Sequence, residues 1–410
     1  GIGTYIKAAS ESHADVRDPA NNAVRINASQ LRCRVLCEGG NLGLTQQARI
    51  EYALAGGMIN TDAMDNSAGV DMSDHEVNLK ILLSAQSGIK LSFDKRNELL
   101  QSLTETVTQQ CLDDNLLQSR TLTLAEAAAA IHPFRLRRLR NHLYHQGWLD
   151  ESVAPRMNED ELLNLRPQLS ILLGQEKNRI HALLNSGEFH HFGTFNNQLL
   201  KHYFPEALHK RFSAKFKKHP LAIEIIHTVA SNHIVNHLGL GAVHHMETMV
   251  DHSASEIVAI LLISDALLDT QAIRSAIWLE AESADQAISL QLLLQEQLLH
   301  FAEELLRLCH VDKLDKTWIK KQQKGLNQFR KGLISELTDS KEIASLQATG
   351  LSATCSEGLA VMPELTHAAC ALHLSSIMEL PLNRCLAASR TCLKLLPIRE
   401  MELQDRKSVV

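Results

Sequence analysis

Three short polar clusters in the first 80 residues carry side chains suited to holding a small organic ligand. They are Glu38-Gly39-Gly40-Asn41, Asn66-Ser67-Ala68-Gly69-Val70 and Ser73-x-x-Glu76. An asparagine amide donates and accepts hydrogen bonds at once, which suits a carboxamide or a ribose hydroxyl. Neighbouring glycines let a flat ring approach the backbone closely. The same residues also fit a plain turn and a helix-capping box, and the box is the favoured interpretation of the serine and glutamate pair.

The elements that must position these clusters are predicted to follow a strand–helix–strand order. Residues 34–37 predict a buried strand, and residues 45–54 predict a helix with Thr45 as its N-cap. Gly56-Gly57 ends that helix, and residues 58–61 predict a second strand. This order is typical of a parallel nucleotide-binding sheet, where ligands bind beyond the carboxyl ends of the strands. We therefore expect a partial Rossmann-like α/β segment at the N-terminus.

The sequence from about residue 73 onward is helical in pattern, because apolar residues recur at helical spacing and Leu and Ala dominate. The expected fold is therefore mixed, with the α/β segment followed by a mainly α-helical region. Residues 271–308 contain no Gly or Pro, so we expect one helix there with at most a weak kink. The other helices are expected at 74–84, 95–117, 122–130, 223–238, 253–268, 315–337 and twice within 342–397, with connections at 151–166 and 185–197.

Composition excludes several classes of protein. The net charge of −6 argues against a general nucleic-acid surface. The basic run Arg135–Arg140 is interpreted as a solvated helix face around two core leucines, Leu136 and Leu139. No apolar stretch is long enough to span a membrane and no signal peptide is visible, so we expect a cytoplasmic protein without a membrane partner. The eight irregularly spaced cysteines are expected to be reduced thiols.

The 21 histidines raise the question of a metal site. The candidate pairs are His190-His191, His244-His245, and His227 with His233. Adjacent histidines on a helix point about 100° apart and rarely chelate one ion, so we expect no metal. His75, beside Ser73, is the histidine most worth testing, although we expect it to be a helix-surface residue.

Two of the clusters together resemble the glutamate dehydrogenase family. Residues 38–45, Glu-Gly-Gly-Asn-Leu-Gly-Leu-Thr, resemble its motif E-G-A-N-x-x-x-T, and residues 66–76 resemble N-A-G-G-V-x-x-S-x-x-E in the same order and spacing. The opening residues and the stretch to Leu83 are similar to the large NAD-specific bacterial class. His202-Tyr203-Phe204-Pro205 and His219-Pro220-Leu221 resemble landmarks of its helical C-terminal region.

The resemblance implies a role for each matching residue. Asn41 and Asn66 would contact the nicotinamide or its ribose, and Gly39 and Gly40 would supply the close backbone approach. Ser73 would bind the distal carboxylate of L-glutamate. The cofactor would be NAD, and no metal would take part. The sequence departs from the smaller family members at Gly40, at Ser67-Ala68 and at Asp74-His75, which leaves the fine substrate geometry open.

The resemblance also implies an organisation and an activity. Residues 1–125 would be the C-terminal half of the NAD-binding catalytic domain with its trailing helices, and residues 126–410 a helical C-terminal domain. The enzyme would convert L-glutamate, NAD and water into 2-oxoglutarate, ammonia and NADH, in glutamate catabolism, as a homo-oligomer. The alternative is a helical regulatory or oligomerisation module attached to a nucleotide-binding domain.

No catalytic residue is expected within this chain. The family's catalytic lysine and aspartate, and its glycine-rich phosphate turn, are expected upstream of Gly1. The context of Lys7, the one lysine before Lys80, is not that of a catalytic lysine. We therefore expect the chain by itself to lack dehydrogenase activity.

Overall fold

The computed structural model describes residues 3–84, 91–151, 154–187, 193, 195–338 and 340–395. The chain divides into two compact units, Gly1–His245 and Met246–Val410. Helices dominate both units, and the strands found among the described residues all lie before residue 60. The mainly helical character expected from the sequence is confirmed.

The first unit opens with two small parallel sheets. Strand β1 (Ile6–Lys7) pairs with β2 (Ile26–Asn27), and β3 (Val35–Leu36) pairs with β4 (Met58–Ile59). A parallel bridge between Ile6 and Leu44 joins the two regions. Helix α1 (His13–Val16) lies between β1 and β2, and α2 (Gln46–Leu54) lies between β3 and β4. The strand–helix–strand order with parallel pairing is therefore confirmed, although each strand has only two residues.

Helix α2 forms as its sequence predicts. The Thr45 hydroxyl accepts the backbone N–H of Ala48 at 3.0 Å, so the expected N-cap is confirmed. The helix packs on a small apolar cluster that includes Ala48, Tyr52 and Ile59. A Cβ at Gly57 would lie 2.3 Å from the Tyr52 ring, so only glycine fits there. The predicted burial of the first strand is wrong, because Val35 faces solvent and is 57% exposed.

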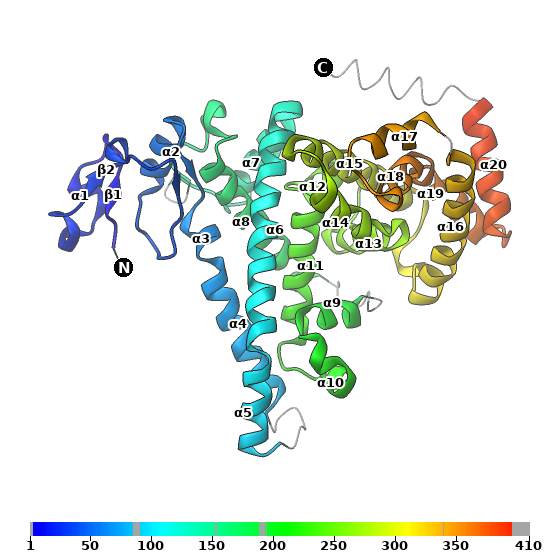
Figure 1. Cartoon of the computed structure of the whole chain (residues 1–410), viewed down its shortest axis with the longest axis horizontal. Coiled ribbons are helices and arrows are strands. Elements are labelled where there is room, and N and C mark those ends of the chain that lie inside the picture. The colour runs from blue at the N-terminus through cyan, green and yellow to red at the C-terminus, as the bar shows by residue number, and fades with distance from the viewer. Residues whose placement is uncertain are drawn as a thin grey trace. The chain divides into compact units, whose positions relative to one another are not determined.

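Several helices of the first unit pack around one long helix, α6, seen in cyan in Figure 1. Helix α6 packs against α4, α8 and α11. It runs on through the Ala-rich stretch to Ile131 and ends before His132-Pro133. The single helix expected over 95–117 is wrong, because one helix ends at Ser102 and α6 begins at Thr104. The helices are α3 (Asp62–Asp65), α4 (Ser67–Leu82), α5 (Phe93–Ser102), α6 (Thr104–Ile131), α7 (Pro133–His145), α8 (Arg166–Ser186), α9 (Asn196–Tyr203), α10 (His209–Phe216), α11 (Ala222–Leu238) and α12 (Ala242–Met249), the last of which runs across the boundary between the units.

The basic run Arg135–Arg140 lies on α7. Its two leucines, Leu136 and Leu139, are buried as predicted. Arg140 differs from a solvated side chain: it is 8% exposed and donates to a carboxylate oxygen of Asp160 at 2.6 Å. One arginine of the run is therefore part of the packing.

The second unit consists of helices around a central apolar one. Helix α13 is buried on nearly every face and packs against α15 and α16. The prediction of one helix over 271–308 is wrong, because the chain leaves helical geometry at Ala281 and restarts at Ser283. The Ser283 hydroxyl accepts the backbone N–H of Gln286 at 3.2 Å and so begins a new helix. The helices are α13 (Ala254–Leu268), α14 (Thr270–Glu280), α15 (Ala284–Leu308), α16 (Lys316–Leu337), α17 (Lys341–Ala348), α18 (Ala353–Thr366), α19 (Ala368–Ile377) and α20 (Leu382–Leu395).

Two further sequence expectations concern the chain as a whole. All eight cysteines have free thiols, as predicted. In the part of the chain that the structure describes, none of the helices has both the length and the apolarity needed to cross a membrane.

Candidate functional site

The two asparagines singled out in the sequence lie in direct contact. The Asn66 amide nitrogen donates to the Asn41 amide oxygen at 2.8 Å. Asn41 follows β3, and Asn66 lies between α3 and α4, in the segment that follows β4. The pair therefore lies where parallel strands end and a helix begins, which is where open α/β sheets bind ligands. The hydrogen bond leaves the Asn41 amide N–H groups and the Asn66 amide oxygen available to a ligand.

Glu38 stabilises the turn that carries Asn41. The sequence analysis assigned no role to this residue. Glu38 is 8% exposed, accepts the backbone N–H of Gly43 and pairs with Arg49 of α2 at 2.6 Å. Its own backbone N–H donates to Asp65 at 2.9 Å. A buried carboxylate needs such partners, since removing one would leave an uncompensated charge. The sequence showed that Glu38 is the first residue of a family-like motif. It did not show that Glu38 pairs with the buried Arg49.

Of the two glycines before Asn41, Gly39 borders open space. A Cβ added at Gly39 would meet nothing within 4 Å, and Gly39 is exposed. Gly40 is half-buried. Room above the Gly39 backbone is compatible with the close approach of a flat ring.

Gly69 is a second constraint that sequence reasoning did not identify. A Cβ at this position would lie 2.9 Å from the side-chain oxygen of Asn66. The backbone N–H of Gly69 also donates to the Asn66 carbonyl at 3.1 Å. The glycine therefore gives the Asn66 amide the space it occupies beside Asn41. Its place in the N-A-G-G-like motif was the available signal.

Ser73 lies in the middle of α4, not at its start. The capping-box interpretation is wrong, because the helix begins at Ser67 and the Ser73 hydroxyl donates to the Gly69 carbonyl at 3.2 Å. The side chain is exposed. Glu76 is exposed as well and pairs with Lys80 one turn later. Ser73 therefore shares a helix with Asn66, two turns away, and its hydroxyl is open to a ligand.

The expectation that His75 is a surface residue is wrong. The side chain is buried at 3% exposure and stacks on Tyr203, with ring centres 4.5 Å apart. The Tyr203 hydroxyl donates to Asp74 at 2.7 Å and accepts from the Asn78 amide at 2.8 Å. Burial lowers the pKa of His75, against the opposing effect of Asp71 and Asp74. Periodicity on one helix could not show this, because α9 covers that face.

Tyr203 and His219, noted above as family-like residues of the helical region, both stabilise α4. Tyr203 holds α4 through Asp74 and Asn78, and a ring nitrogen of His219 contacts the Asn78 carbonyl at 3.1 Å. Burial raises the pKa of Tyr203 and lowers that of His219. Both residues fix the helix that carries Ser73.

Two ionisable groups lie near the buried face of α4. Burial raises the pKa of Asp114 to about 6, with a further contribution from the negative charge of Asp71. Burial lowers the pKa of Lys177 to about 7, and attraction to Asp114 opposes that effect. Lys177 is thus the cation that faces this group of carboxylates.

The lysine nearest the N-terminus is not placed for chemistry. Lys7 is 8% exposed, and its ammonium donates to the Asn27 amide oxygen at 2.6 Å and to the Ala8 carbonyl at 3.2 Å. It is a structural residue that ties β1 to the end of β2.

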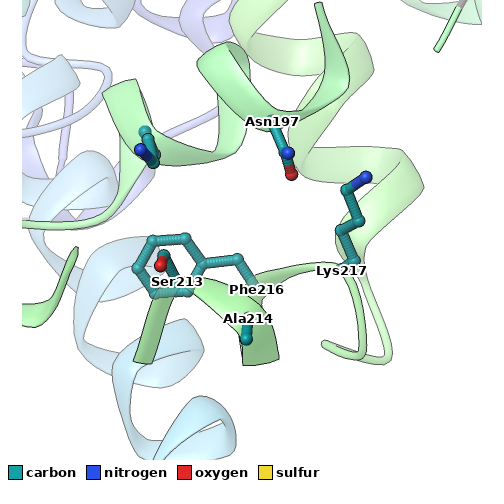
Figure 2. A pocket seen from close by; sticks show the side chains of 6 residues that line it. Asn197, Ser213, Ala214, Phe216 and Lys217 are labelled. Carbon is teal, nitrogen blue, oxygen red and sulfur yellow. The ribbon is translucent and has the colours of Figure 1, made fainter. Parts of the chain in front are cut away.

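A separate hollow of about 350 Å³ lies among α9, α10 and the turn after α10. Figure 2 shows the Phe216 ring across the opening from Asn197, with Lys217 along another side. Lys201 and Ser213 complete the polar lining. Two ammonium groups, an amide and a hydroxyl suit an anionic small molecule. The motif residues Asn41, Asn66 and Ser73 line neither this hollow nor the smaller one beside Arg137 and Asp160.

The other histidines considered as metal ligands differ in their surroundings. His190-His191 lies outside the described residues. His227 is buried and contacts the Asn185 amide oxygen through a ring nitrogen at 2.5 Å. His245 lies near Arg135 and Arg138, and burial together with these charges lowers its pKa to about 4.

Comparison with known proteins agrees with the motifs. Residues 1–125 match the family described as bacterial NAD-glutamate dehydrogenase, catalytic domain, and residues 163–403 match glutamate dehydrogenase, C-terminal. The second match alone covers more than half of the chain. The chain therefore belongs to the glutamate dehydrogenase family.

Relatives narrow this to the large NAD-specific class found in bacteria. The chain is 37% identical over 299 residues to the NAD-specific glutamate dehydrogenase of Mycobacterium tuberculosis, covering 71% of this chain and 18% of that protein. It is 36% identical to the protein of the same name from Pseudomonas aeruginosa, over 64% of this chain and 17% of that protein. The relative from Halomonas elongata is 37% identical over 58% of this chain and 15% of its own length. The chain thus spans less than a fifth of these relatives.

Proposed function

We propose that this chain is part of an enzyme that oxidatively deaminates L-glutamate with NAD. L-Glutamate, NAD⁺ and water give 2-oxoglutarate, ammonium, NADH and a proton. The proposal rests on the contact between Asn41 and Asn66 at the ends of parallel strands, together with the names of the relatives. NAD supplies the hydride acceptor, and the protein orients it against the substrate.

The described residues suit the binding part of this task. The Asn41 N–H groups and the Asn66 amide oxygen, left available by their mutual hydrogen bond, match the acceptors and donors of a carboxamide or ribose hydroxyl. Gly39 leaves the backbone approachable, and we propose that Gly40 does the same. The exposed Ser73 hydroxyl can donate to a carboxylate of the substrate. We propose that β3, α2 and β4 belong to a Rossmann-like segment.

The proposed organisation follows the same lines. Residues 1–125 form part of the catalytic domain with its trailing helices, and residues 126–410 form the helical C-terminal domain. The enzyme is proposed to act in the cytoplasm as a homo-oligomer. The family match over residues 1–125 supports the first boundary.

Steady-state kinetics of the protein as its gene encodes it test the assignment. Asn41→Ala and Asn66→Ala should raise KM for NAD about 2- to 12-fold, because each removes hydrogen bonds worth roughly 0.5–1.5 kcal/mol. KM for glutamate should change less. The control is Asn383→Ala, at an exposed asparagine in the second unit.

Ser73→Ala tests the substrate role separately. It should raise KM for glutamate more than KM for NAD, since the hydroxyl is proposed to meet the carboxylate. Ser289→Ala is a matched control, because Ser289 is also exposed on a helix and its hydroxyl donates to the carbonyl four residues back at 2.9 Å. Identical kinetics for the two serine variants would rule out the role given to Ser73.

The hollow lined by Lys201 and Lys217 favours a second role, regulation by an anionic effector. Lys217→Met should then abolish the response to an anionic metabolite while basal turnover stays unchanged. An unaltered dose–response curve would remove this candidate. Lys215→Met is the control, because Lys215 lies on α10, two residues before Lys217, but outside the lining.

A further inference from the structure

Three metal-ligating side chains of different kinds meet beneath α4. Asp71 and His75 come from α4, and Cys111 comes from α6. One potential ligand atom from each residue lies within 4.8 Å of the other two. Asp71 and His75 are four residues apart on one helix, the spacing that places two ligands on the same face. Carboxylate, imidazole and thiolate are the three ligand types that zinc uses in proteins.

Buried polar atoms in this cluster lack partners. Among the described residues, a ring nitrogen of His75 and one carboxylate oxygen of Asp71 are shielded from solvent and lack a hydrogen-bond partner. The Cys111 thiol forms a hydrogen bond with the Asp71 carboxylate. The other ring nitrogen of His75 lies 3.7 Å from the other Asp71 oxygen, too far for a hydrogen bond. His75 is 3% exposed and Cys111 is 1% exposed. Leaving such groups unpaired is costly, so unsatisfied buried atoms call for a missing partner.

The surrounding charges do not supply that partner. The Asp74 carboxylate is already satisfied by Tyr203 and Asn78. Asp71 and Asp114 both face Lys177, so one ammonium group is opposed by two carboxylates. A bound cation would offset this excess of negative charge.

We propose that Asp71, His75 and Cys111 bind one divalent transition-metal ion, with Zn²⁺ as the preferred ion and water in the fourth position. Zinc–ligand bonds of about 2.0–2.3 Å place tetrahedral ligands about 3.3–3.8 Å apart. The distance of 3.7 Å between His75 and Asp71 already lies in this range, and the separations from Cys111, each below 4.8 Å, need only a small closure. Binding displaces the thiol proton of Cys111 to solvent, and the thiolate with the Asp71 carboxylate balances the charge of the ion.

The ion would tie α4 to α6. Asn66 and Ser73 both lie on or next to α4, so the metal would fix the helix that carries the proposed binding residues. This role is structural and does not depend on the proposed dehydrogenase activity. This proposal departs from the expectation that no metal is bound, which rested on neighbouring histidines and not on a cysteine 36 positions away on another helix.

Cobalt titration of the full chain, without an affinity tag, tests the site. Co²⁺ should bind at one equivalent and produce a thiolate-to-cobalt charge-transfer band, which Zn²⁺ then removes by displacement. Cys111→Ser should abolish the band. Asp71→Asn and His75→Gln should weaken Zn²⁺ binding by more than the roughly 10- to 100-fold that loss of an outer-shell partner costs.

Two controls separate this site from adventitious thiol binding. Cys355→Ser replaces an equally buried cysteine in the second unit, and Cys37→Ser replaces an exposed one. Both should retain the band at full intensity. A band that survives Cys111→Ser, or the lack of any band in the unaltered chain, would overturn the proposal. Because the unaltered chain alone can give that negative result, a variant that fails to fold does not prevent the test.

Discussion

Among single residues, Asn66 is the most tightly constrained member of the candidate site. Its amide meets Asn41 on one side, and the Cα of Gly69 lies against it on the other. The side chain therefore has little room to move, and its position depends on a neighbour without a side chain.

Replacing Gly69 by Ala should displace this amide. The new Cβ would stand 2.9 Å from the Asn66 oxygen, which is closer than packed atoms tolerate. We expect NAD binding by the whole enzyme to weaken by about 2- to 12-fold, the value of one lost hydrogen bond. Isothermal titration with NAD measures this. Gly332→Ala is the control, because a Cβ at that helical glycine meets open space; equal affinities for both variants would contradict the role of Gly69.

His245 should make stability depend on pH. Its pKa in the folded chain is lowered from 6.5 to about 4, so the folded protein keeps this ring neutral while the unfolded chain protonates it. Its contribution to stability is therefore complete above pH 6.5 and is lost as pH falls towards 4. The loss amounts to at most about 3 kcal/mol.

Urea unfolding of the chain and of His245→Gln between pH 7 and pH 4 measures this contribution. The free energy of unfolding of the unaltered chain should fall relative to the variant across that interval. A difference that stays constant with pH would show that the neutral ring is not the cause.

Among the elements, the break between α14 and α15 shows that an N-cap can start a new helix even where the helical spacing of apolar residues continues. The stretch has no Gly or Pro, and its apolar spacing continues on both sides. A serine hydroxyl at position 283 nevertheless satisfies a free N–H of the next helix, and the chain turns there.

Ser283→Ala should lower the free energy of unfolding by about 1 kcal/mol, because the cap of α15 is lost. Urea unfolding followed by circular dichroism is the measurement. Ser289→Ala, in the body of the same helix, removes a hydroxyl that caps nothing and should leave stability nearly unchanged. If the two variants are equally stable, the cap does not hold the break in place.

Another element-scale result concerns α4. Its outer face carries Ser73, while its inner face carries Asp71, His75 and Asn78 against α6 and α9. From the sequence, this segment was interpreted only as a family-like motif and a capping box. That interpretation identified Ser73 on the outer face but not the residues of the buried face. A single helix therefore presents the face proposed to bind a ligand and a polar packing face.

On the scale of the whole molecule, the residues proposed to bind NAD and glutamate are glycines, asparagines and a serine, none of which is a general base at neutral pH. Two lysines of the N-terminal region are engaged elsewhere, Lys7 with Asn27 and Lys80 with Glu76. General acid–base chemistry needs a titratable group within reach of the substrate.

We therefore predict that the 410-residue chain shows no NADH formation with L-glutamate and NAD. Absorbance of NADH measures this directly. The positive control is the same assay on the protein as its gene encodes it. Turnover by the chain alone would show that it contains a base that has been overlooked.

The sequence by itself determined those features that depend on neighbouring residues. The N-cap at Thr45, the parallel strand–helix–strand order and the buried leucines of α7 were all predictable, because caps and periodicity act over a few residues. The motif also identified Asn41 and Asn66. Only the tertiary structure decided that these two amides touch, that Glu38 meets Arg49, and that His75 lies buried beside Cys111. These contacts form between residues that are far apart in the sequence, and they depend on which helix faces pack against each other. A local sequence pattern therefore cannot predict them.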